Sequence, residues 1–521
     1  MRRLGCLILL VVAAGPGAAL ARLESAQVTL DYVAKKAEER ARAPFRSPKA
    51  DLPEVLRQDN LDYDKYREIE FRHEKALWLA EDLPFRVEFF HPGYLYQEPV
   101  HIYEFTLTHV QPIRFVQDFF NYRQLRIQKQ IPADTGYAGF RLLYPLNAED
   151  KWDELGAFLG ASYFRLLGKG QRYGSSARGL ALDCGEPDRP EEFPIFTDWW
   201  LGKPHRDDDQ LRLHAILDSV SCVGAYEFRI RPGETTIADI EAVLFFREED
   251  KVRAANPQRK RLKTIGVAPL TSMFWFGENS ERKFDDYRPE VHDSDGLLVR
   301  MDNGETLWRP LNNASAMRHQ RFATKNVRGF GLLQRDREFA GYEDLFNNYH
   351  LVPSVWVEPR GHWGEGDVHL VELSTQYEGL DNIVAFWDPK EKPPPMQPFR
   401  FAYTLYWTRE TDMRLSENKV LATRIGADPR DPRRRQIVID FGGPKLSVIP
   451  KDIPPQAVAN CNDNAAIIEN QVFHNPVNNT WRVILKLEPK TGNTDPVNVR
   501  CTLMKGEEVL SETWTYLWSP P

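Results

Sequence analysis

The sequence predicts a mostly β protein with a large N-terminal domain and a small C-terminal immunoglobulin-like sandwich. From residue 84 onward, short runs of aromatic and β-branched residues are bounded by Gly, Pro or Asn, which is typical of antiparallel strands. The proline-rich stretch DPKEKPPPMQP, residues 388–398, predicts a stiff connector. About seven strand-like runs follow it within roughly 120 residues, a spacing that favours a sandwich.

Residues 1–21 have the pattern of a secretory signal peptide. Arg2 and Arg3 precede the apolar run Leu7–Ala14, and small residues at 19–21 form a cleavage site. The apolar run is too short to span a bilayer, and no other segment is apolar enough. Removal of residues 1–21 takes away two arginines and no acid, so the net charge of −7 becomes −9. An acidic protein argues against nucleic acid or an anionic membrane as the main partner.

The large domain, residues 22–390, is expected to begin with helical segments and continue as strands. Apolar residues recur near helical spacing in residues 23–43, and the short stretch KALWLA, residues 75–80, repeats this pattern. One further helix is expected over residues 146–168. The clearest predicted strands are PFRVEFFHPG (84–93), HIYEFT (101–106), YEFRIRPG (226–233) and IEAVLFFRE (240–248).

The C-terminal domain, residues 391–521, is expected to contain strands of alternating character. Lys505 and Gly506 lie where a hairpin turn is expected. The predicted strands are FRFAYTLYW (399–407), RQIVIDF (435–441), TWRVILKLEP (480–489), NVRCTLM (498–504) and ETWTYLW (512–518).

Four cysteines lie beyond the signal segment: Cys184, Cys222, Cys461 and Cys501. Four cysteines allow three pairings, and the spacing favours one bridge from 184 to 222 and another from 461 to 501. Buried free thiols are the alternative, because a chain of this size does not need disulfides for stability.

Several common enzyme motifs are absent from the sequence, including G-x-S-x-G, the P-loop and H-E-x-x-H. The stretch RPEVHDSDGLLV (288–299) instead gathers Glu290, His292, Asp293 and Asp295 before a predicted strand. It matches only a fragment of a calcium loop, so we predict no metal site here. A solvated turn is the simplest alternative for this cluster by itself.

A second acidic cluster has the same relation to a strand. Glu378 and Asp381 directly precede the apolar run IVAFW, residues 383–387. Acids at two strand entrances can face each other across a cleft and supply the proton donor and the base of glycoside hydrolysis. The sequence between the clusters is rich in aromatic residues that suit a sugar, although the core is the commoner place for any one of them: Trp275, Trp308, Trp356, Trp363, Trp387 and Tyr349, with Arg309, Asn312 and Asn313 nearby.

Three long motifs resemble a known family. They are MFWFGENSERKFDDYRPEVHDSDGLL (273–298), WRPLNN (308–313) and LDNIVAFW (380–387). They are similar to the OpgG/OpgD family, also called MdoG/MdoD, which contains periplasmic proteins of osmoregulated glucan biosynthesis. The resemblance covers essentially the whole chain after the signal segment.

The resemblance implies a galactose-mutarotase-like β-sandwich followed by an immunoglobulin-like domain. It further implies an inverting endo-β-1,2-glucanase or a related transglycosylase that cyclises or remodels β-1,2-glucan. The family's general acid corresponds to Asp381 and its general base to Asp293. A non-catalytic glucan-binding scaffold is the alternative function.

Residues beyond the catalytic pair are expected to bind the glucan. The resemblance suggests Glu378 and Tyr349. The acidic cluster at 288–299 adds His292 and Asp295, and the aromatic-rich sequence that follows it adds Trp308, Arg309 and Trp356. No cofactor is expected. The expected partners are linear or cyclic β-1,2-glucan and the inner-membrane glucan synthesis machinery, in the periplasm. The oligomeric state is left open, with a homodimer as one option.

One segment departs from the family pattern. Residues 424–441 are expected to form a loop that is shorter than in hydrolytic members, where it helps to close the active site. A shorter loop leaves open whether water or a sugar hydroxyl accepts the glucan chain.

Overall fold

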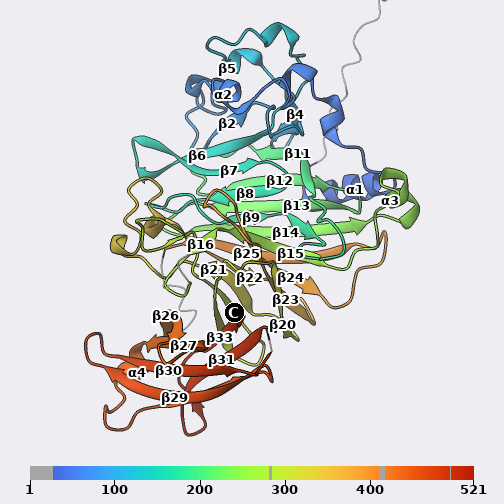
Figure 1. Cartoon of the computed structure of the whole chain (residues 1–521). Helices are drawn as coiled ribbons and strands as arrows, with labels where there is room; N and C mark the ends of the chain where they lie inside the picture. The colour runs from blue at the N-terminus through green and yellow to red at the C-terminus, as the bar shows by residue number, and fades with distance from the viewer. Residues whose placement is uncertain (1–26, 281–283, 410–416, 493, 521) are drawn as a thin grey trace, which may run out of the picture.

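The structure is a computed structural model that describes residues 27–280, 284–409, 417–492 and 494–520. It is mostly β, as predicted, and consists of two sandwiches of unequal size (Figure 1). The predicted signal segment lies outside the described residues. Among the described helices, none is long and apolar enough to cross a membrane.

Two large sheets pack face to face in the large sandwich. The ten-stranded sheet contains β2 (Arg86–Phe90), β6 (Gly139–Ala148), β7 (Lys151–Leu159), β8 (Tyr163–Leu166), β9 (Ser176–Arg178), β15 (Ile265–Ser272), β24 (Ile383–Pro389), β23 (Gly366–Glu372) and β20 (Arg318–Thr324), with β10 (Leu180–Leu182) on β15. From the other sheet, Trp199 lies 5.1 Å from Phe140 and 4.9 Å from Phe158, measured between ring centroids. Such aromatic contacts bury much apolar area and join the two sheets in one core.

The second sheet has fifteen strands and extends into the small sandwich. Its order is β4 (Val110–Ile113), β3 (His101–Phe105), β11 (Ile195–Gly202), β12 (Leu211–Asp218), β13 (Cys222–Arg231), β14 (Thr236–Phe246), β25 (Phe399–Thr408), β22 (Ser354–Pro359), β21 (Gly329–Leu333), β18 (Gly296–Arg300), β19 (Thr306–Pro310), β33 (Thr513–Trp518), β31 (Val497–Lys505) and β28 (Gln456–Cys461), with β32 (Glu508–Val509) on β31. The parallel pairing of β19 with β33 joins the two sandwiches.

A four-stranded sheet completes the small sandwich. It contains β26 (Lys419–Asp428), β27 (Asp431–Gly442), β30 (Thr480–Pro489) and β29 (Ala465–Asn475). Its core also includes Leu298, Trp308 and Trp356 from the large sandwich. The junction between the sandwiches is therefore a continuous hydrophobic core, and Figure 1 shows the small sandwich directly against the end of the large one.

Short helices and two small ribbons complete the fold. The α-helices are α1 (Leu30–Ala41), α2 (Tyr63–Tyr66), α3 (Glu249–Ala255) and α4 (Pro444–Ser447). The 3₁₀ helices are η1 (Pro48–Asp51), η2 (Glu54–Leu56), η3 (His73–Lys75), η4 (Gln117–Phe119), η5 (Gln128–Gln130), η6 (Phe339–Gly341) and η7 (Tyr349–Leu351), and the ribbons are β1 (Glu70–Phe71) with β5 (Phe120–Asn121) and β16 (Phe274–Phe276) with β17 (Val291–His292).

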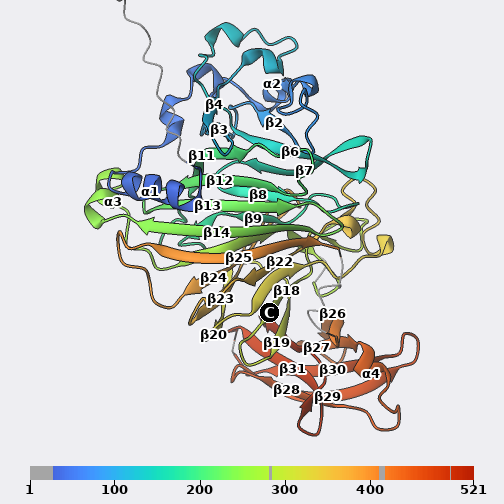
Figure 2. The same ribbon diagram turned by 180° about the vertical axis from the view of Figure 1, so that it is seen from behind.

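Helix α1 confirms the first predicted helix. The Thr29 hydroxyl accepts a hydrogen bond from the Tyr32 amide and caps the helix N-terminus. Val33 and Ala37 are buried on the helix face that contacts β12, β13 and β14. Figure 2 shows α1 lying across these strands. The KALWLA stretch is not an α-helix, because only η3 reaches its first residue.

The helix predicted over residues 146–168 is wrong. The segment forms β7 and β8, and β7 pairs with both β6 and β8. Gly156 and Gly160 weaken the helical state, since glycine is a poor helix former. A Cβ atom at Gly156 would lie 2.3 Å from Leu166, so close approach of β7 and β8 requires glycine there.

Two predictions about the C-terminal part also need correction, and a third is confirmed. The strand at 399–408, β25, lies in the large sandwich between β14 and β22. The predicted loop at 424–441 is most of the β26–β27 hairpin, whose strands are separated only by residues 429–430. The turn at Lys505 and Gly506 is confirmed, because β31 folds back there onto β32.

The two predicted disulfides are not present, and the four cysteines are free. In the small sandwich, Cys461 lies opposite Val499 and Cys501 lies opposite Ala459, so the two thiols are offset along neighbouring strands. Cys184 and Cys222 belong to different hydrophobic clusters. The alternative of unpaired thiols therefore holds, and three of the four are buried.

Candidate active site

The two predicted acids lie at the entrances of strands from opposite sheets. Asp293 comes shortly before β18 of the fifteen-stranded sheet, and Asp381 comes two residues before β24 of the ten-stranded sheet. The carboxylate of Asp381 is close enough to Asp293 to act on its ionisation. The structure thus brings together two acids that are far apart in the sequence.

Phe274 of β16 holds the two acidic segments side by side. Its backbone amide donates to Asn382 Oδ1 at 2.9 Å, and its carbonyl accepts from Asn382 Nδ2 at 3.0 Å. On the other side, Phe274 lies opposite His292 in the β16–β17 ribbon. The residue after Asp381 and the residue before Asp293 are therefore both held by the same position of β16.

A row of buried serine hydroxyls supports the Asp293 segment. Ser272 at the end of β15 accepts a hydrogen bond from Ser175 at 2.9 Å. It also lies 2.6 Å from the hydroxyl of Ser294, directly after Asp293. Because the three hydroxyls are buried, they fix the backbone beside Asp293 to both β9 and β15.

The environments of the two acids differ. Asp293 is 9% exposed, and burial, followed by the negative charge of Asp381, raises its pKa to about 7. The side chain of Asp381 is 30% exposed, and its Oδ2 accepts from Arg165 Nη2 at 3.2 Å. Arg165 and Asp381 come from β8 and the loop before β24, respectively.

Glu378 and Tyr349 form a hydrogen-bonded pair beside the acids. The Tyr349 hydroxyl donates to Glu378 Oε2 at 2.7 Å. Burial and this contact raise the pKa of Tyr349, and the charge of Asp293 contributes to the increase. Glu378 in turn contributes to the raised pKa of Asp293. These two predicted residues therefore share the local environment of the acidic pair.

Arg288 connects three loops at this site. Its Nη1 donates to Glu378 Oε2 at 2.7 Å and to Asp344 Oδ2 at 2.8 Å. Each loop presents a large exposed side chain next to these contacts, namely Tyr287 (77% exposed), Phe346 (92%) and Tyr377 (59%). Exposed rings near a polar site suit the flat apolar faces of pyranose sugars.

His292 directly precedes Asp293 and is fully buried. The prediction that His292 contacts the substrate is therefore wrong. Its Nδ1 lies 2.9 Å from Gln334 Oε1, and its Nε2 lies 2.8 Å from Glu290 Oε2. Burial alone would lower the pKa of His292, but the contact with Glu290 outweighs burial and raises the pKa to about 9. A protonated His292 can donate from both ring nitrogens.

Asp295 faces a different part of the molecule. Its Oδ2 accepts from the backbone amides of Arg335 and Asp336, at 2.7 and 3.1 Å. It lines a cavity of about 30 Å³ together with Glu278, Glu290, His292 and Asp336. Glu290, His292 and Asp336 place ligand-type atoms within 4.8 Å of one another, but His292 already uses both ring nitrogens in hydrogen bonds, and we assign no metal to them.

Three predicted sugar-binding residues are inside the protein. Trp308, Arg309 and Trp356 are 3%, 1% and 1% exposed, so the structure contradicts a direct contact with glucan. The two tryptophans belong to the junction core of the sandwiches. Arg309 donates to Gln320 at 2.7 Å and lies 5.0 Å from the centre of the Tyr516 ring.

Sequence reasoning missed Arg165, Arg288 and the three exposed rings. Tyr287, Arg288 and Tyr377 are immediate neighbours of predicted site segments, and this adjacency was the available signal. Arg165 lies in the stretch YFRLLGKGQRYGSSARGLAL (163–182), which also resembles the family, but it is 216 residues from Asp381 and no local pattern connects the two.

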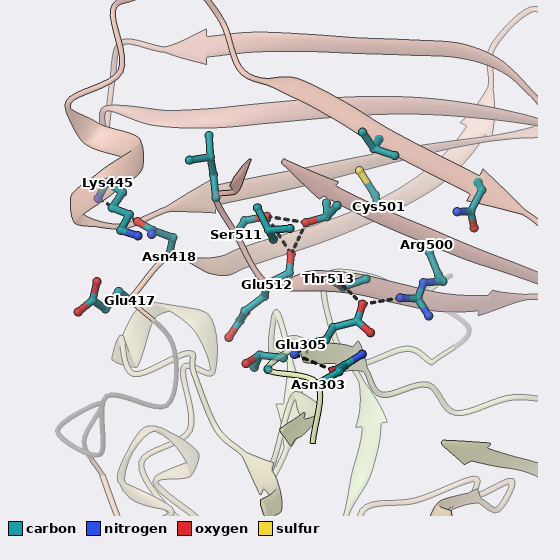
Figure 3. A pocket seen from close by; sticks show the side chains of 17 residues that line it. Asn303, Glu305, Glu417, Asn418, Lys445, Arg500, Cys501, Ser511, Glu512 and Thr513 are labelled. Atoms are coloured by element: carbon teal, nitrogen blue, oxygen red, sulfur yellow. Dashed lines mark hydrogen bonds and ion pairs between the residues drawn. The ribbon is translucent and has the colours of Figure 1, made fainter. Parts of the chain in front are cut away.

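Two cavities lie near the junction of the sandwiches. One of about 430 Å³ is lined by aromatic and amide side chains, including Trp275, Asn313, Gln376 and Trp518. The other, of about 660 Å³, is bordered by Glu305, whose Oε1 accepts hydrogen bonds from Arg500 and Thr513 (Figure 3). Among the described residues that line this larger cavity, none is aromatic. The smaller cavity is the one that adjoins the loop carrying Glu378 and Asp381.

The site motifs agree with a comparison against known protein families. The family model described as "Periplasmic glucan biosynthesis protein, MdoG" matches residues 29–518. The match spans both sandwiches and every residue of the candidate site. This chain therefore belongs to the MdoG family of periplasmic glucan biosynthesis proteins.

Proposed function

We propose that this protein is a periplasmic enzyme that cleaves or transfers β-1,2-glucan with inversion, using Asp381 as general acid and Asp293 as general base. The observation that carries the proposal is the juxtaposition of these two carboxyl groups from opposite sheets, with burial and Asp381 together raising the pKa of Asp293. Two neighbouring carboxyls retain one proton at pH values where isolated ones have lost both. A pair that holds one proton contains one protonated carboxyl, which can act as the general acid, and one carboxylate, which can act as the general base.

In the proposed reaction, Asp381 donates its proton to the glycosidic oxygen as the bond to C1 breaks. Asp293 takes a proton from the attacking hydroxyl group, directly or through an intervening hydroxyl or water. The new bond forms on the face opposite to the leaving oxygen, so a single displacement inverts C1. Proton loss and gain balance, and the pair is reset by proton exchange with solvent.

Other residues of the site would bind the sugar. Glu378 and Tyr349 present a carboxylate and a hydroxyl to sugar hydroxyls, and Arg288 fixes both Glu378 and the neighbouring loop. Tyr287, Phe346 and Tyr377 supply exposed rings for pyranose faces. Because the protein is acidic and glucan is neutral, charge does not oppose this ligand.

The place of action is proposed from two observations. The family description names the periplasm, and residues 1–21 have the pattern of a cleaved export signal. We expect the exported protein to begin at Arg22. N-terminal sequencing of protein recovered from the periplasm tests this start.

The experiment that tests the function is incubation of the protein lacking residues 1–21 with linear β-1,2-glucan. Mass and linkage analysis of the products separates hydrolysis, transfer and the absence of a reaction. Asp381→Asn and Asp293→Asn should each lower turnover by roughly two to four orders of magnitude. Asp239→Asn is a matched control, because Asp239 is also paired with an arginine, Arg231, at 2.7 Å on a different part of the sheet. Near-native turnover in Asp381→Asn, or no product from the wild type, rejects the proposal.

A further inference from the structure

Arg165 forms an ion pair with Asp381, and this ion pair is unfavourable for the role of Asp381 as a proton donor. Its Nη2 donates to Asp381 Oδ2 at 3.2 Å, and its Nε donates to Ser176 Oγ at 2.5 Å. A guanidinium beside a carboxylate stabilises the ionised form of that carboxylate. Asp381 must instead be protonated at the moment when it donates to a leaving oxygen.

Burial has the opposite effect on Asp293, because it favours the protonated form of this carboxyl group. Its pKa is raised to about 7 by burial and then by Asp381, although Arg165 opposes the shift. In the empty protein, burial therefore favours a proton on Asp293, whereas the 3.2 Å contact places the positive charge of Arg165 beside Asp381. Glycoside cleavage with the roles proposed above requires the reverse arrangement, with the proton on Asp381.

We propose that Arg165 is a positioning residue that keeps Asp381 ionised in the empty protein and that bound glucan displaces it, so that Asp381 becomes a proton donor only when the site is occupied. The inference rests on the proposed function. In the step, Asp293 loses one proton and Asp381 gains one through a bound hydroxyl or solvent, and the total charge of the pair does not change.

The geometry allows this displacement. The pair is a single contact between side chains that are 40% and 30% exposed, and ion pairs of this kind are weak in water. The hydroxyl of Ser176 can hold Nε while the outer nitrogens of Arg165 turn to sugar hydroxyls. Sugar hydroxyls can accept hydrogen bonds from a guanidinium without holding Asp381 in its ionised form.

The groups that face the acidic pair come from each neighbouring element. Arg165 and Tyr163 belong to β8; burial raises the pKa of Tyr163, and the charge of Asp381 adds a smaller contribution. His292 of β17 directly precedes Asp293, and its contact with Glu290 outweighs burial and raises its pKa to about 9. Glu378 and Tyr349 complete the surroundings from the loop before β24 and from η7. Among these groups, only Arg165 makes a hydrogen bond to Asp381.

The first test compares the pH dependence of kcat/KM and kcat on linear β-1,2-glucan for wild type, Arg165→Gln and Arg165→Lys. The kcat/KM profile reports the empty protein, and the kcat profile reports the complex. In Arg165→Gln, loss of the positive charge should move the kcat/KM profile up by about half to one pH unit. The kcat profile should stay in place, because Arg165 has already left Asp381 in the complex.

Two variants control this test. Arg165→Lys keeps the charge and should restore most of the wild-type kcat/KM profile. Arg231→Gln removes a similarly exposed arginine, 38% exposed and paired with Asp239, and should change neither profile. Equal shifts of kcat/KM and kcat in Arg165→Gln would mean that Arg165 remains on Asp381 in the complex, which overturns the proposal. An unchanged kcat/KM profile overturns it as well.

The second test does not depend on turnover. The carboxyl ¹³C signal of Asp381, assigned with Asp381→Asn, shows whether this group carries a proton at pH 6. We expect the carboxylate position in empty wild type and movement toward the carboxylic acid position in empty Arg165→Gln. If the wild type proves inactive, the proposed function fails, and adding linear β-1,2-glucan to it still decides this inference. Movement toward the acid position supports it, and an unmoved signal rejects it.

Discussion

Asn382 binds Phe274 through both the donor and the acceptor of its side-chain amide, at 3.0 and 2.9 Å. Asn382 is fully buried and also donates to the carbonyl of Leu373 at 2.9 Å. These contacts fix the residue that follows Asp381 to the strand that also pairs with His292. The distance between the two acids thus depends on one side chain that cannot itself contact a substrate.

Asn382→Ala should lower the free energy of unfolding by about 2–4 kcal/mol, because it leaves several buried backbone groups without partners. It should also reduce turnover at a temperature where the protein is still folded, since Asp381 loses its fixed position. Denaturant unfolding and kinetics of the same preparation measure both effects. Asn326→Ala is the control, because Asn326 accepts from the backbone of Trp363 and Gly364 outside the site. If both variants lose stability and only Asn382→Ala loses activity, the positioning role is supported, and equal activities count against it.

Tyr377→Ala and Phe346→Ala should each weaken the binding of linear β-1,2-glucan by about three- to tenfold, the range expected for one aromatic contact. Their rings are exposed beside Glu378 and Asp344, so truncation should leave stability nearly unchanged. Calorimetric titration of these changes in an Asp381→Asn background avoids turnover. Phe473→Ala removes an exposed ring of the small sandwich and should bind as tightly as the parent. Unaltered affinity in both test variants would remove these rings from the binding surface.

Asp293→Asn should stabilise the protein above neutral pH. Asp293 ionises at its ordinary pKa of 3.8 in the unfolded chain and at about 7 in the folded protein. Between these values the folded protein retains a proton that the unfolded chain has lost, so the contribution of this group to stability falls as pH rises from about 4 to 7. Asparagine has no such dependence. Denaturant unfolding at pH 5, 6, 7 and 8 should show a widening advantage for Asp293→Asn, whereas a constant difference would mean that Asp293 ionises normally.

The four cysteines beyond the signal segment should react as free thiols. After unfolding without reductant, an alkylating reagent should modify Cys184, Cys222, Cys461 and Cys501, and intact mass should increase by four additions. The folded protein should react slowly, because Cys184, Cys222 and Cys501 are buried. Two unreactive cysteines after unfolding would demonstrate a disulfide that the strand register does not favour.

Much of the fold was predictable because strands have local signatures. The runs at β2, β3, β13 and β14 alternate or cluster apolar residues between turn residues, and each forms the predicted strand. The segment 146–168 was misassigned because its apolar spacing also fits a helix, and pairing with β6 decided the outcome. The place of β25 depends on its pairing with β14 and β22, which no local pattern specifies.

The site was predictable to the extent that its residues are adjacent to recognisable motifs. Asp293 and Asp381 each lie shortly before an apolar strand, which can be recognised in the sequence. Glu378 and Tyr349 lie close to this acidic pair. Trp308, Trp356 and Arg309 were misassigned because a sequence does not distinguish a buried tryptophan or a buried arginine from one that binds sugar. Arg165 was missed because its contact with Asp381 depends on the packing of β8 beside β9.

The central claim is that Asp381 and Asp293 act as an inverting pair on β-1,2-glucan. The most direct test is ¹H NMR of the first products formed by the wild-type protein from linear β-1,2-glucan, recorded before the anomers equilibrate. A single displacement on a β-linkage predicts that new reducing ends appear first as the α-anomer, or that transfer products carry a new α-linkage. Initial release of the β-anomer, or transfer products that are exclusively β-linked, would contradict the assignment of Asp293 as base.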